Sequence, residues 1–318
     1  MIEPRIALVT GGTGFIGASL VRRLVSDGWE THVIVRPDSD LSVLSGIGQA
    51  IRVHVHDGST EGLIAIVKAA SPRVVFHLAS LFLAQHAPQD VERLIHSNLL
   101  FSTQLLEAMS VNSVRYLINT GTSWQHYENR DYSPVCLYAA TKQAFEAVLT
   151  YYVEVSGLSA ITLKLCDTYG PDDPRVKLFT LLRKTARTRE LLLMSPGEQL
   201  IDLVYIDDVL DAYLLATERL LQDKVSGHEI YAVTSGQPVK LRDLVAGYSQ
   251  IIGQPLLIEW GARPYRPREV MLPWNKGEIV PGWEPKVALA AGIALMEQPL
   301  RLPETIGRMA GGKIRAED

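Results

Sequence analysis

The chain has 318 residues, 47% of them hydrophobic, so it can bury one large core or two smaller ones and is not expected to be disordered. Its 31 basic and 35 acidic residues give a net charge of −4 without a basic stripe, which argues against nucleic acid or a polybasic membrane contact. The two cysteines, Cys136 and Cys166, suggest neither a disulfide framework nor a metal site, and the chain has no leader-like N-terminus and no apolar run of about 18 residues, so we expect a cytoplasmic protein without a membrane span.

Short apolar runs rich in β-branched residues alternate with amphipathic stretches of helical length. The runs span residues 6–9, 31–35, 74–78, 116–118 and 161–165. Because polar residues do not alternate with the apolar ones, we expect these strands to be buried on both faces. The order of elements predicts an α/β fold, a Rossmann doubly wound parallel sheet.

From about Gly170 onward, prolines interrupt shorter elements and the regular alternation fades. We therefore expect residues 1–167 to form an NAD(P)-binding Rossmann domain, to which a segment near 200–233 returns. Residues 168–199 and 234–318 are expected to form a smaller α+β substrate-binding region. The tail, residues 303–318, is expected to be loosely attached.

A glycine-rich turn, TGGTGFIG at residues 10–17, follows the first strand and opens an amphipathic helix. Gly11, Gly14 and Gly17 allow a tight turn, a close approach of backbone N–H groups to a pyrophosphate, and close packing of the helix on the sheet. The helix N-terminus then faces the anion. The alternative is a loop that merely needs positive φ, but its place between strand and helix favours a dinucleotide site.

The second strand ends in VRPDS at residues 35–39. Rossmann sites for NAD usually place an acid here, which binds the ribose 2′-hydroxyl. Arg36 can instead pair bidentately with a 2′-phosphate, helped by the hydroxyl of Ser39. This favours NADP(H) as the cofactor and leaves NAD(H) possible; the alternative for Arg36 is an ordinary solvated arginine.

Hydroxyl groups follow a buried strand in residues 118–123, where the carboxyl edge of the sheet should open. A hydroxyl at this place can hold a substrate oxygen while charge develops on it. We expect Thr122 in this role, with Ser123 as the next candidate. The alternative for each is a loop residue whose hydroxyl bonds to the backbone.

Tyr138 and Lys142 lie four residues apart in residues 134–155, a stretch with helical spacing of apolar residues, and so share one helix face. A free tyrosine titrates at about 10, and a nearby ammonium group should lower that pKa and make the phenol a usable acid or base. Lys142 can also bond the nicotinamide ribose and orient the ring. Taken alone, the pair is more often an ordinary surface pair, and only its neighbours favour catalysis.

Together these motifs resemble the extended short-chain dehydrogenase/reductase family, in its nucleotide-sugar epimerase/dehydratase branch. In the family's order come the glycine-rich turn, Asp57, HLAS at 77–80, Asn98, the Thr122 segment, YxxxK at 138–142, YGP at 169–171, LVYIDDV at 203–209 and GWEPK at 282–286. The resemblance covers roughly residues 5–297, and a set of ordered motifs is far more specific than any one of them.

The resemblance implies sets of binding residues. The implied cofactor contacts are Gly11, Thr13, Gly14, Phe15, Ile16, Arg36, Ser39, Asp57, Gly58, Leu78, Ala79, Ser80, Asn98, Thr120, Tyr138, Lys142 and Leu165. The implied substrate contacts are Leu81, Thr122, Ser123, Asp167 and Arg266. Asp57 should contact the adenine, the alternative being a cap of the helix that begins near Ser59 and Thr60.

Departures from the family pattern narrow the expected substrate. Ser123 and Trp124 stand where dehydratases of the family carry an acidic pair, which argues against dehydration. Lys164, Asp167 and Ile201 replace residues that usually contact the diphosphate, which puts those contacts in doubt. In its Gly-Thr-Ser loop and its YAATKQAFE segment the chain is most similar to CDP-abequose and CDP-paratose synthases, which are 4-ketoreductases of nucleotide-linked deoxysugars.

Three arginines, Arg263, Arg266 and Arg268, fall within six residues and suit a sugar-nucleotide diphosphate. The resemblance points to Arg266, and the alternative is a solvated basic loop. His86, His96 and His126 are left out of the catalytic set, because a lone histidine near a cleft usually serves packing or faces solvent.

The sequence therefore predicts NADPH-dependent reduction of the 4-keto group of a nucleotide-diphosphate-linked 6-deoxyhexose, with Tyr138 as the proton donor. The alternatives are a nucleotide-sugar 4-epimerase that keeps NAD, a dinucleotide-sensing regulator without chemistry, and a reductase of a free, flavonoid-like ketone. The resemblance also implies a homodimer formed through the helices near residues 89–109 and 135–156, and we expect no metal.

Overall fold

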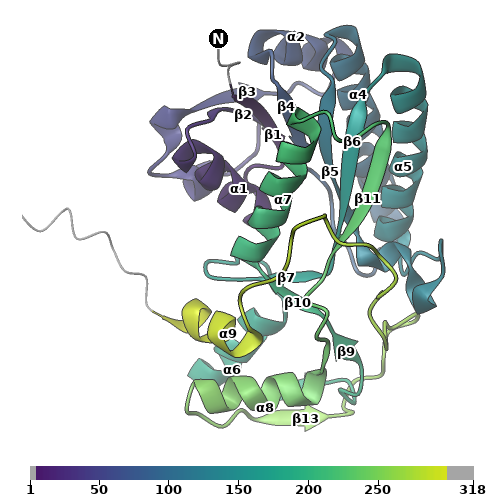
Figure 1. Cartoon of the computed structure of the whole chain (residues 1–318). Coiled ribbons are helices and arrows are strands. Elements are labelled where there is room, and N and C mark those ends of the chain that lie inside the picture. Colours follow the sequence, from purple (N-terminus) through teal and green to yellow (C-terminus); the bar gives the residue numbers. More distant parts are fainter. Residues whose placement is uncertain (1–4, 299–318) are drawn as a thin grey trace, which may run out of the picture.

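A seven-stranded, all-parallel sheet lies at the centre of the computed structural model, which describes residues 5–298 (Figure 1). Its strands lie in the order β11-β6-β5-β4-β1-β2-β3. The strands are β1 (Ile6–Thr10), β2 (Glu30–Val35), β3 (Ile51–Val55), β4 (Val74–His77), β5 (Tyr116–Thr122), β6 (Ser159–Leu165) and β11 (His228–Val233). The strand order reverses between β1 and β4, so the predicted doubly wound Rossmann sheet is confirmed.

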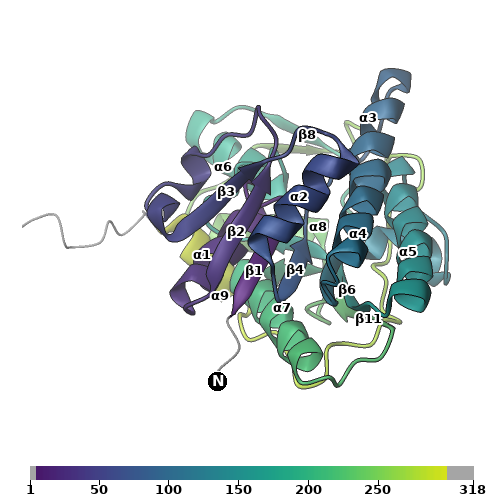
Figure 2. The ribbon, with the colours of Figure 1, turned by 90° about the horizontal axis from the view of Figure 1, so that it is seen from above.

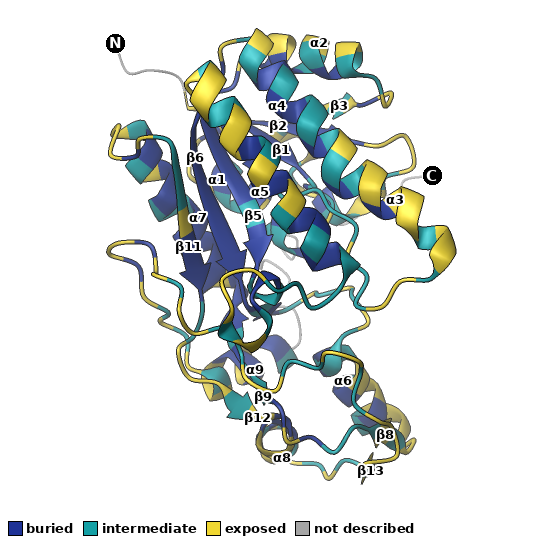
Figure 3. Ribbon diagram, turned by 90° about the vertical axis from the view of Figure 1, so that its right-hand side faces the viewer, coloured by how far each residue is buried: buried dark blue, intermediate teal, exposed yellow. Residues whose placement is uncertain are grey.

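Burial along the strands follows the sequence prediction. No residue of β1, β4 or β6 is exposed, because helices cover both faces of the sheet there. Figure 3 shows these strands buried and the outer faces of the helices exposed. The edge strand β3 differs, with Val53 and Val55 exposed, since its outer edge has no neighbouring strand in the sheet.

Helices form a layer on each face of the sheet, as the view from above shows (Figure 2). One face is covered by α1 (Phe15–Ser26) and α7 (Ile206–Leu221). The other face is covered by α2 (Thr60–Ala70), α4 (Phe101–Val111) and α5 (Leu137–Ser156). Before α4, the chain passes through α3 (Val91–Ile95) and a π-helical turn, His96–Leu100, which continue into it. Each layer buries its own apolar cluster against the strands, which gives the sheet two cores.

A smaller region of short elements lies at the carboxyl end of the sheet (Figure 1). Its strands form three two-stranded pairs, namely β7 (Asp167–Tyr169) with β10 (Leu203–Tyr205), β9 (Leu200–Ile201) with β12 (Val239–Lys240), and β8 (Leu192–Met194) with β13 (Ile258–Trp260). Its helices are α6 (Leu178–Thr188), α8 (Leu241–Ile251) and α9 (Leu289–Glu297). The segment predicted to return near 200–233 brings α7 and β11 to the main sheet. The exact domain limits stay a prediction.

Two motifs far apart in the sequence hold each other in place. The indole Nε1 of Trp283 donates to the backbone oxygen of Asp208 at 2.9 Å. The buried carboxylate of Asp208 accepts the backbone N–H groups of Lys286 and Val287, each at 3.0 Å. The segment before α9 is thereby fixed to α7, which explains why the LVYIDDV and GWEPK motifs occur together.

The remaining expectations concern the termini, the membrane and the cysteines. The tail at residues 303–318 lies outside the described residues. No helix in residues 5–298 is long and apolar enough to span a membrane. Cys136 and Cys166 are both free.

Candidate active site

Three adjoining cavities open at the carboxyl ends of the strands. The central cavity, of about 200 Å³, lies above β1, β5 and β6 and shares residues with the other two. The β2-side cavity, of about 670 Å³, extends from the glycine-rich turn toward the end of β2. The third cavity, of about 120 Å³, begins behind Trp124 and reaches Arg266. Ligands of open α/β sheets bind at this edge, where the strand order reverses.

Most of the predicted site residues line these cavities. The central cavity contains Gly11, Gly14, Phe15, Ile16, Leu78, Ser80, Thr120, Thr122, Ser123, Tyr138, Lys142, Leu165 and Asp167. The β2-side cavity contains Gly11, Thr13, Gly14, Arg36, Ser39, Asp57, Gly58, Leu78, Ala79, Ser80 and Leu81. Arg266 lines only the third cavity. Most of these residues are therefore brought together at the carboxyl ends of neighbouring strands.

The glycine-rich turn needs its glycines for steric reasons. Gly11 has a φ of 73°, and a Cβ on it would lie 2.6 Å from the backbone nitrogen of Ala79. A Cβ on Gly17 would lie 2.0 Å from the carbonyl oxygen of Gly11, so the helix can approach the turn only without a side chain there. No acidic residue lies in the first turn of α1. The open backbone and the helix N-terminus fit a pyrophosphate.

At the end of β2, Arg36 lies at the wall of the β2-side cavity with an exposed guanidinium. Its Nε is 3.3 Å from the Oδ1 of Asp38, which is equally exposed, so the pair is only weakly held. The hydroxyl of Ser39 accepts the backbone N–H of Arg36 at 3.0 Å. The turn thus presents an exposed cation at the wall of the β2-side cavity.

Asp57 shapes the same cavity but does not itself cap α2. Its Oδ1 accepts the backbone N–H and the hydroxyl of Ser59, both at 2.8 Å, and these bonds hold the pKa of the carboxyl below its usual range. The cap is Ser59, whose hydroxyl accepts the N–H of Gly62. Asp57 therefore fixes the cap residue while it lines the cavity.

Asn98, one of the predicted cofactor contacts, lines none of the three cavities, and its contact with a cofactor stays a prediction. Its amide is fully buried in the π-helical turn and bonds the backbone N–H of Leu81 at 2.6 Å and its carbonyl at 3.0 Å. The same amide donates to the hydroxyl of Thr141 on α5. Asn98 therefore braces the loop after β4 against the helix that carries Tyr138.

Tyr138 and Lys142 share the inner face of α5 and both line the central cavity, as predicted. Their ionisation differs from the expectation that Lys142 lowers the pKa of Tyr138. Burial instead raises the pKa of Tyr138 to about 12, against a smaller lowering by its hydrogen bond with Ser80. Burial also lowers the pKa of Lys142 to about 8. The enclosed site disfavours both charges, and Tyr138 is a protonated phenol at neutral pH.

Thr122 ends β5 near α5, the helix that carries Tyr138. Its backbone N–H donates to the Oε1 of Gln125 at 3.0 Å, and its hydroxyl accepts the N–H of Trp124 at 3.3 Å. Gln125 is held in turn by Glu146 on α5. The hydroxyl hydrogen of Thr122 is therefore available to a ligand, whereas Thr120 shares its hydroxyl with Tyr213 at 2.6 Å.

An aromatic wall beside Tyr138 was not predicted. The ring of Phe82 meets that of Tyr138 edge to face at 5.0 Å and lies 5.5 Å from that of Trp124. Arg175 and Lys177 also line the central cavity, and neither was predicted. The only sequence signal for these two cations was their place shortly after the Tyr-Gly-Pro turn, a motif for which no cation was inferred.

Asp167 and Arg266 lie at the substrate side, each already paired. Asp167 Oδ1 is 3.2 Å from the Nζ of Lys177. Arg266 Nη2 is 2.7 Å from the Oε1 of Glu269, and its guanidinium stacks on Trp124 at 5.4 Å. Glu269, which lines the third cavity too, was missed by the sequence reasoning. A diphosphate bound by Arg266 would have to share it with Glu269.

His126, which was left out of the predicted catalytic set, lines the third cavity and packs on a neighbouring aromatic ring. Its ring stacks on Trp274 at 4.1 Å, and its Nε2 lies 2.9 Å from the Nζ of Lys164. Lys164 is buried and also pairs with Glu146 at 3.2 Å. This network joins β6, α5 and the segment around Trp274 below the central cavity.

Comparisons with known proteins agree with this geometry. A sequence model of the NAD dependent epimerase/dehydratase family matches residues 7–233. UDP-glucose 4-epimerase of Mycolicibacterium smegmatis is 30% identical over 319 residues, which cover 90% of this chain and 96% of that protein. CDP-abequose synthase of Salmonella muenchen is 24% identical over 91% of this chain and 96% of that one. The solved UDP-glucose 4-epimerase of Thermus thermophilus, in complex with NAD, is 25% identical over 91% and 97%, with a TM-score of 0.76.

Proposed function

Since the chain belongs to the NAD dependent epimerase/dehydratase family, we propose that it reduces the 4-keto group of a nucleotide-linked 4-keto-6-deoxyhexose with NADPH. The observation that carries the proposal is the enclosed phenol of Tyr138, which is protonated at neutral pH and lies beside Lys142 and Thr122. A reduction needs a proton donor at this place, because the oxygen of the ketone gains a proton as the carbon gains the hydride.

The residues of the chain have separate tasks in this reaction. The bound dinucleotide supplies the hydride. The glycine-rich turn holds its pyrophosphate, and Lys142 bonds the nicotinamide ribose. The hydroxyl of Thr122, with Ser123 beside it, donates to the ketone oxygen while charge builds there, and Tyr138 delivers the proton. Phe82 and Trp124 wall the cavity on one side, which helps to exclude water.

The preference for NADPH rests on Arg36. The guanidinium is exposed at the wall of the β2-side cavity, so it can turn toward a 2′-phosphate without breaking a strong contact. Asp38, its present partner, lines the same cavity and offers a carboxylate that a ribose hydroxyl of NAD(H) can bind. NAD(H) therefore remains the second cofactor to test.

The substrate class rests on Arg266 and on relatives. CDP-abequose synthase and UDP-glucose 4-epimerase are both named for nucleotide-linked sugars. Arg266 offers a guanidinium at the third cavity that can bind a diphosphate. The proposal also includes a homodimer and a cytoplasmic location for the protein. Ser123 and Trp124, in place of an acidic pair, argue against water elimination.

A 4-epimerase is the second candidate, favoured by the 30% identity to UDP-glucose 4-epimerase. It would begin by removing a proton from a sugar hydroxyl. The raised pKa of Tyr138 keeps the phenol protonated at neutral pH, which is unfavourable for that first step.

The two functions differ in their use of the cofactor. Purified protein is mixed with NADPH and, in turn, the CDP-, UDP- and dTDP-linked 4-keto-6-deoxyglucoses, and the NADPH absorbance is followed. We expect one NADPH to be consumed for each ketosugar reduced, with one of the nucleotides clearly preferred. In a parallel assay with NAD⁺ and the corresponding 4-hydroxy sugar nucleotides, interconversion of the two C4 epimers without net cofactor consumption would show an epimerase, and the reductase proposal would be wrong if ketosugars were not reduced.

A further inference from the structure

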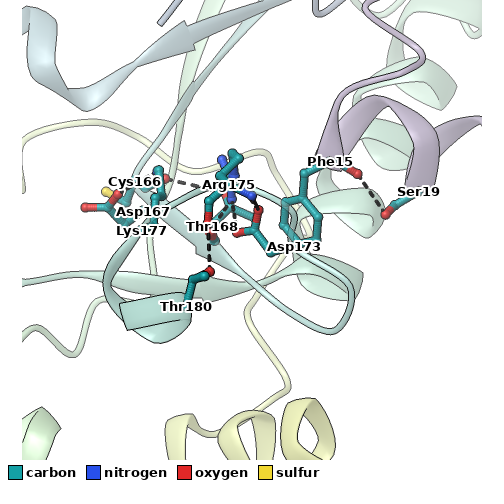
Figure 4. A network of polar contacts seen from close by, with 9 residues as sticks. All are labelled: Phe15, Ser19, Cys166, Asp167, Thr168, Asp173, Arg175, Lys177 and Thr180. Atoms are coloured by element: carbon teal, nitrogen blue, oxygen red, sulfur yellow. Dashed lines mark hydrogen bonds and ion pairs between the residues drawn. The ribbon is translucent and has the colours of Figure 1, made fainter. Parts of the chain in front are cut away.

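Arg175 reaches from the smaller region to the glycine-rich turn. It lies in the loop between β7 and α6, shortly after the Tyr-Gly-Pro motif, and its Cζ is 4.6 Å from the centre of the Phe15 ring. Figure 4 shows the guanidinium beside this ring, with Asp173 and Thr168 around it. Phe15 is the first residue of α1, and Arg175 lines the central cavity together with Gly11 and Gly14.

The guanidinium is held in this position by its own loop. Nε donates to Asp173 Oδ1 at 2.7 Å, and Nη2 donates to Asp173 Oδ2 at 2.6 Å and to the carbonyl oxygen of Thr168 at 2.9 Å. These bonds use three of the five N–H donors of an arginine. The side chain of Arg175 keeps 31% of its surface exposed, so the group is oriented and still accessible.

The turn itself supplies no charge for a diphosphate. Residues 10–17 contain neither lysine nor arginine, so they offer only backbone N–H groups and the end of the helix dipole. Arg36 lies at the far end of the β2-side cavity, and Lys142 is enclosed on α5. Arg175 is the cation that stacks directly on the turn.

We propose that Arg175 is a ligand of the dinucleotide's diphosphate, and that Asp173 holds the guanidinium ready for it. The inference rests on the proposed function, since it takes the glycine-rich turn as the pyrophosphate site. A guanidinium suits this task because its planar set of donors matches two phosphate oxygens at once.

The loop also links the two ligand sites. Two residues after Arg175, Lys177 pairs with Asp167 and lies over the ring of Phe82 at 5.4 Å. A contact of Arg175 with the dinucleotide would therefore fix the loop that borders the substrate side of the central cavity. The guanidinium of Arg175 could instead bind the diphosphate of the sugar nucleotide. Its position over Phe15, at the start of α1, favours the dinucleotide.

Substitution of the two partners of the ion pair tests the proposal. Calorimetric titration with NADP⁺, and separately with UDP and CDP as diphosphate probes, is carried out on wild type, Arg175→Gln, Arg175→Lys and Asp173→Asn. We expect Arg175→Gln to weaken NADP⁺ binding by at least about 10-fold and Arg175→Lys to recover part of it. Asp173→Asn keeps one acceptor oxygen for the guanidinium at the same side-chain length, so it should weaken the affinity by less than about threefold. The salt dependence of NADP⁺ binding should be weaker in Arg175→Gln than in wild type.

Several results would overturn the inference. Equal losses in Arg175→Gln and Asp173→Asn, with unchanged salt dependence, would show that the pair only braces the loop. Unchanged NADP⁺ affinity in Arg175→Gln would exclude the contact, and a loss confined to UDP and CDP would assign Arg175 to the substrate. If wild type bound no dinucleotide in the NADP⁺ titration or in a parallel one with NAD⁺, the proposed function itself would fail, and the inference with it. Thermal unfolding without ligand checks that each variant is folded.

Discussion

Lys142 is buried beside the central cavity, and its burial affects the pH at which its ammonium group loses a proton. Burial lowers its pKa from the usual 10.5 to about 8, so the side chain is an ammonium below that pH and neutral above it. Tyr138, with a pKa of about 12, stays protonated across the same range. As Tyr138 gives up its proton, a nearby ammonium stabilises the phenolate that forms.

We therefore expect kcat for ketone reduction to fall as pH rises through about 8 in the wild-type protein. In Lys142→Arg the side chain stays charged, so the fall should disappear from this range even if the overall rate is lower. The measurement is kcat between pH 6 and pH 10 at saturating NADPH and ketosugar for both proteins. Profiles of the same shape would contradict the role given to the ammonium.

At the residue scale, the sequence predicted the positions of the cavity residues better than their ionisation and contacts. Gly11 and Arg36 directly follow strands and Thr122 ends one, and parallel strands end at one edge, so the positions of these residues could be inferred. Arg175 could not be found in this way, because its position depends on the path of a loop. The high pKa of Tyr138 could not be foreseen either, since it comes from burial that no spacing reveals.

At the element scale, the packing of α1 against the glycine-rich turn can be tested with one added methyl group. In Gly17→Ala the Cβ would lie 2.0 Å from the carbonyl oxygen of Gly11, so the turn or the helix must move. We expect the variant to lose about 1–3 kcal/mol in the free energy of unfolding and much of its dinucleotide affinity. Gly247→Ala in α8 is the control, because nothing lies within 4 Å of an added Cβ and the helix should gain up to ~1 kcal/mol.

Denaturant unfolding and NADP⁺ titration of both variants give the comparison. Wild-type NADP⁺ affinity in Gly17→Ala would mean that the turn adapts easily, and that its geometry does not determine dinucleotide binding.

The helices and strands themselves were predicted unevenly from the sequence. Apolar runs predicted β1, β2, β4, β5 and β6 of the main sheet but not its two edge strands, β3 and β11. Strands such as β9 and β12 are two residues long and have no periodicity to detect.

At the scale of the whole molecule, Asp208 joins the segment before α9 to the main sheet through α7. Asp208→Ala removes the buried carboxylate that accepts the backbone N–H groups of Lys286 and Val287, which should cost about 3 kcal/mol in the free energy of unfolding. Asp207→Ala, an exposed neighbour at the same helix end, should cost at most about 1 kcal/mol. Equal losses in denaturant unfolding of the two variants would contradict this account of the two motifs.

The assembly of two chains stays a prediction. Tyr151 and Val155 are each 60% exposed on the outer face of α5, one of the two helices expected at the interface. The two helices contain enough apolar residues to form an interface. The sequence of a single chain, however, does not distinguish an apolar residue exposed to solvent from one that a second chain covers. At the scale of the whole molecule, the sequence predicted the two interface helices and the order of the family motifs. It did not predict that Asp208 links two of those motifs.

The central claim is that Tyr138 donates a proton while a hydride passes from NADPH to the ketone carbon. The most direct test follows the transfer of deuterium from NADPH labelled at nicotinamide C4 to the sugar, by mass spectrometry and NMR, in wild type and Tyr138→Phe. The account predicts one deuterium at sugar C4 for each NADPH oxidised by wild type, and transfer slowed at least about 100-fold in Tyr138→Phe with NADP⁺ affinity retained. Equal transfer rates in the two proteins would contradict it.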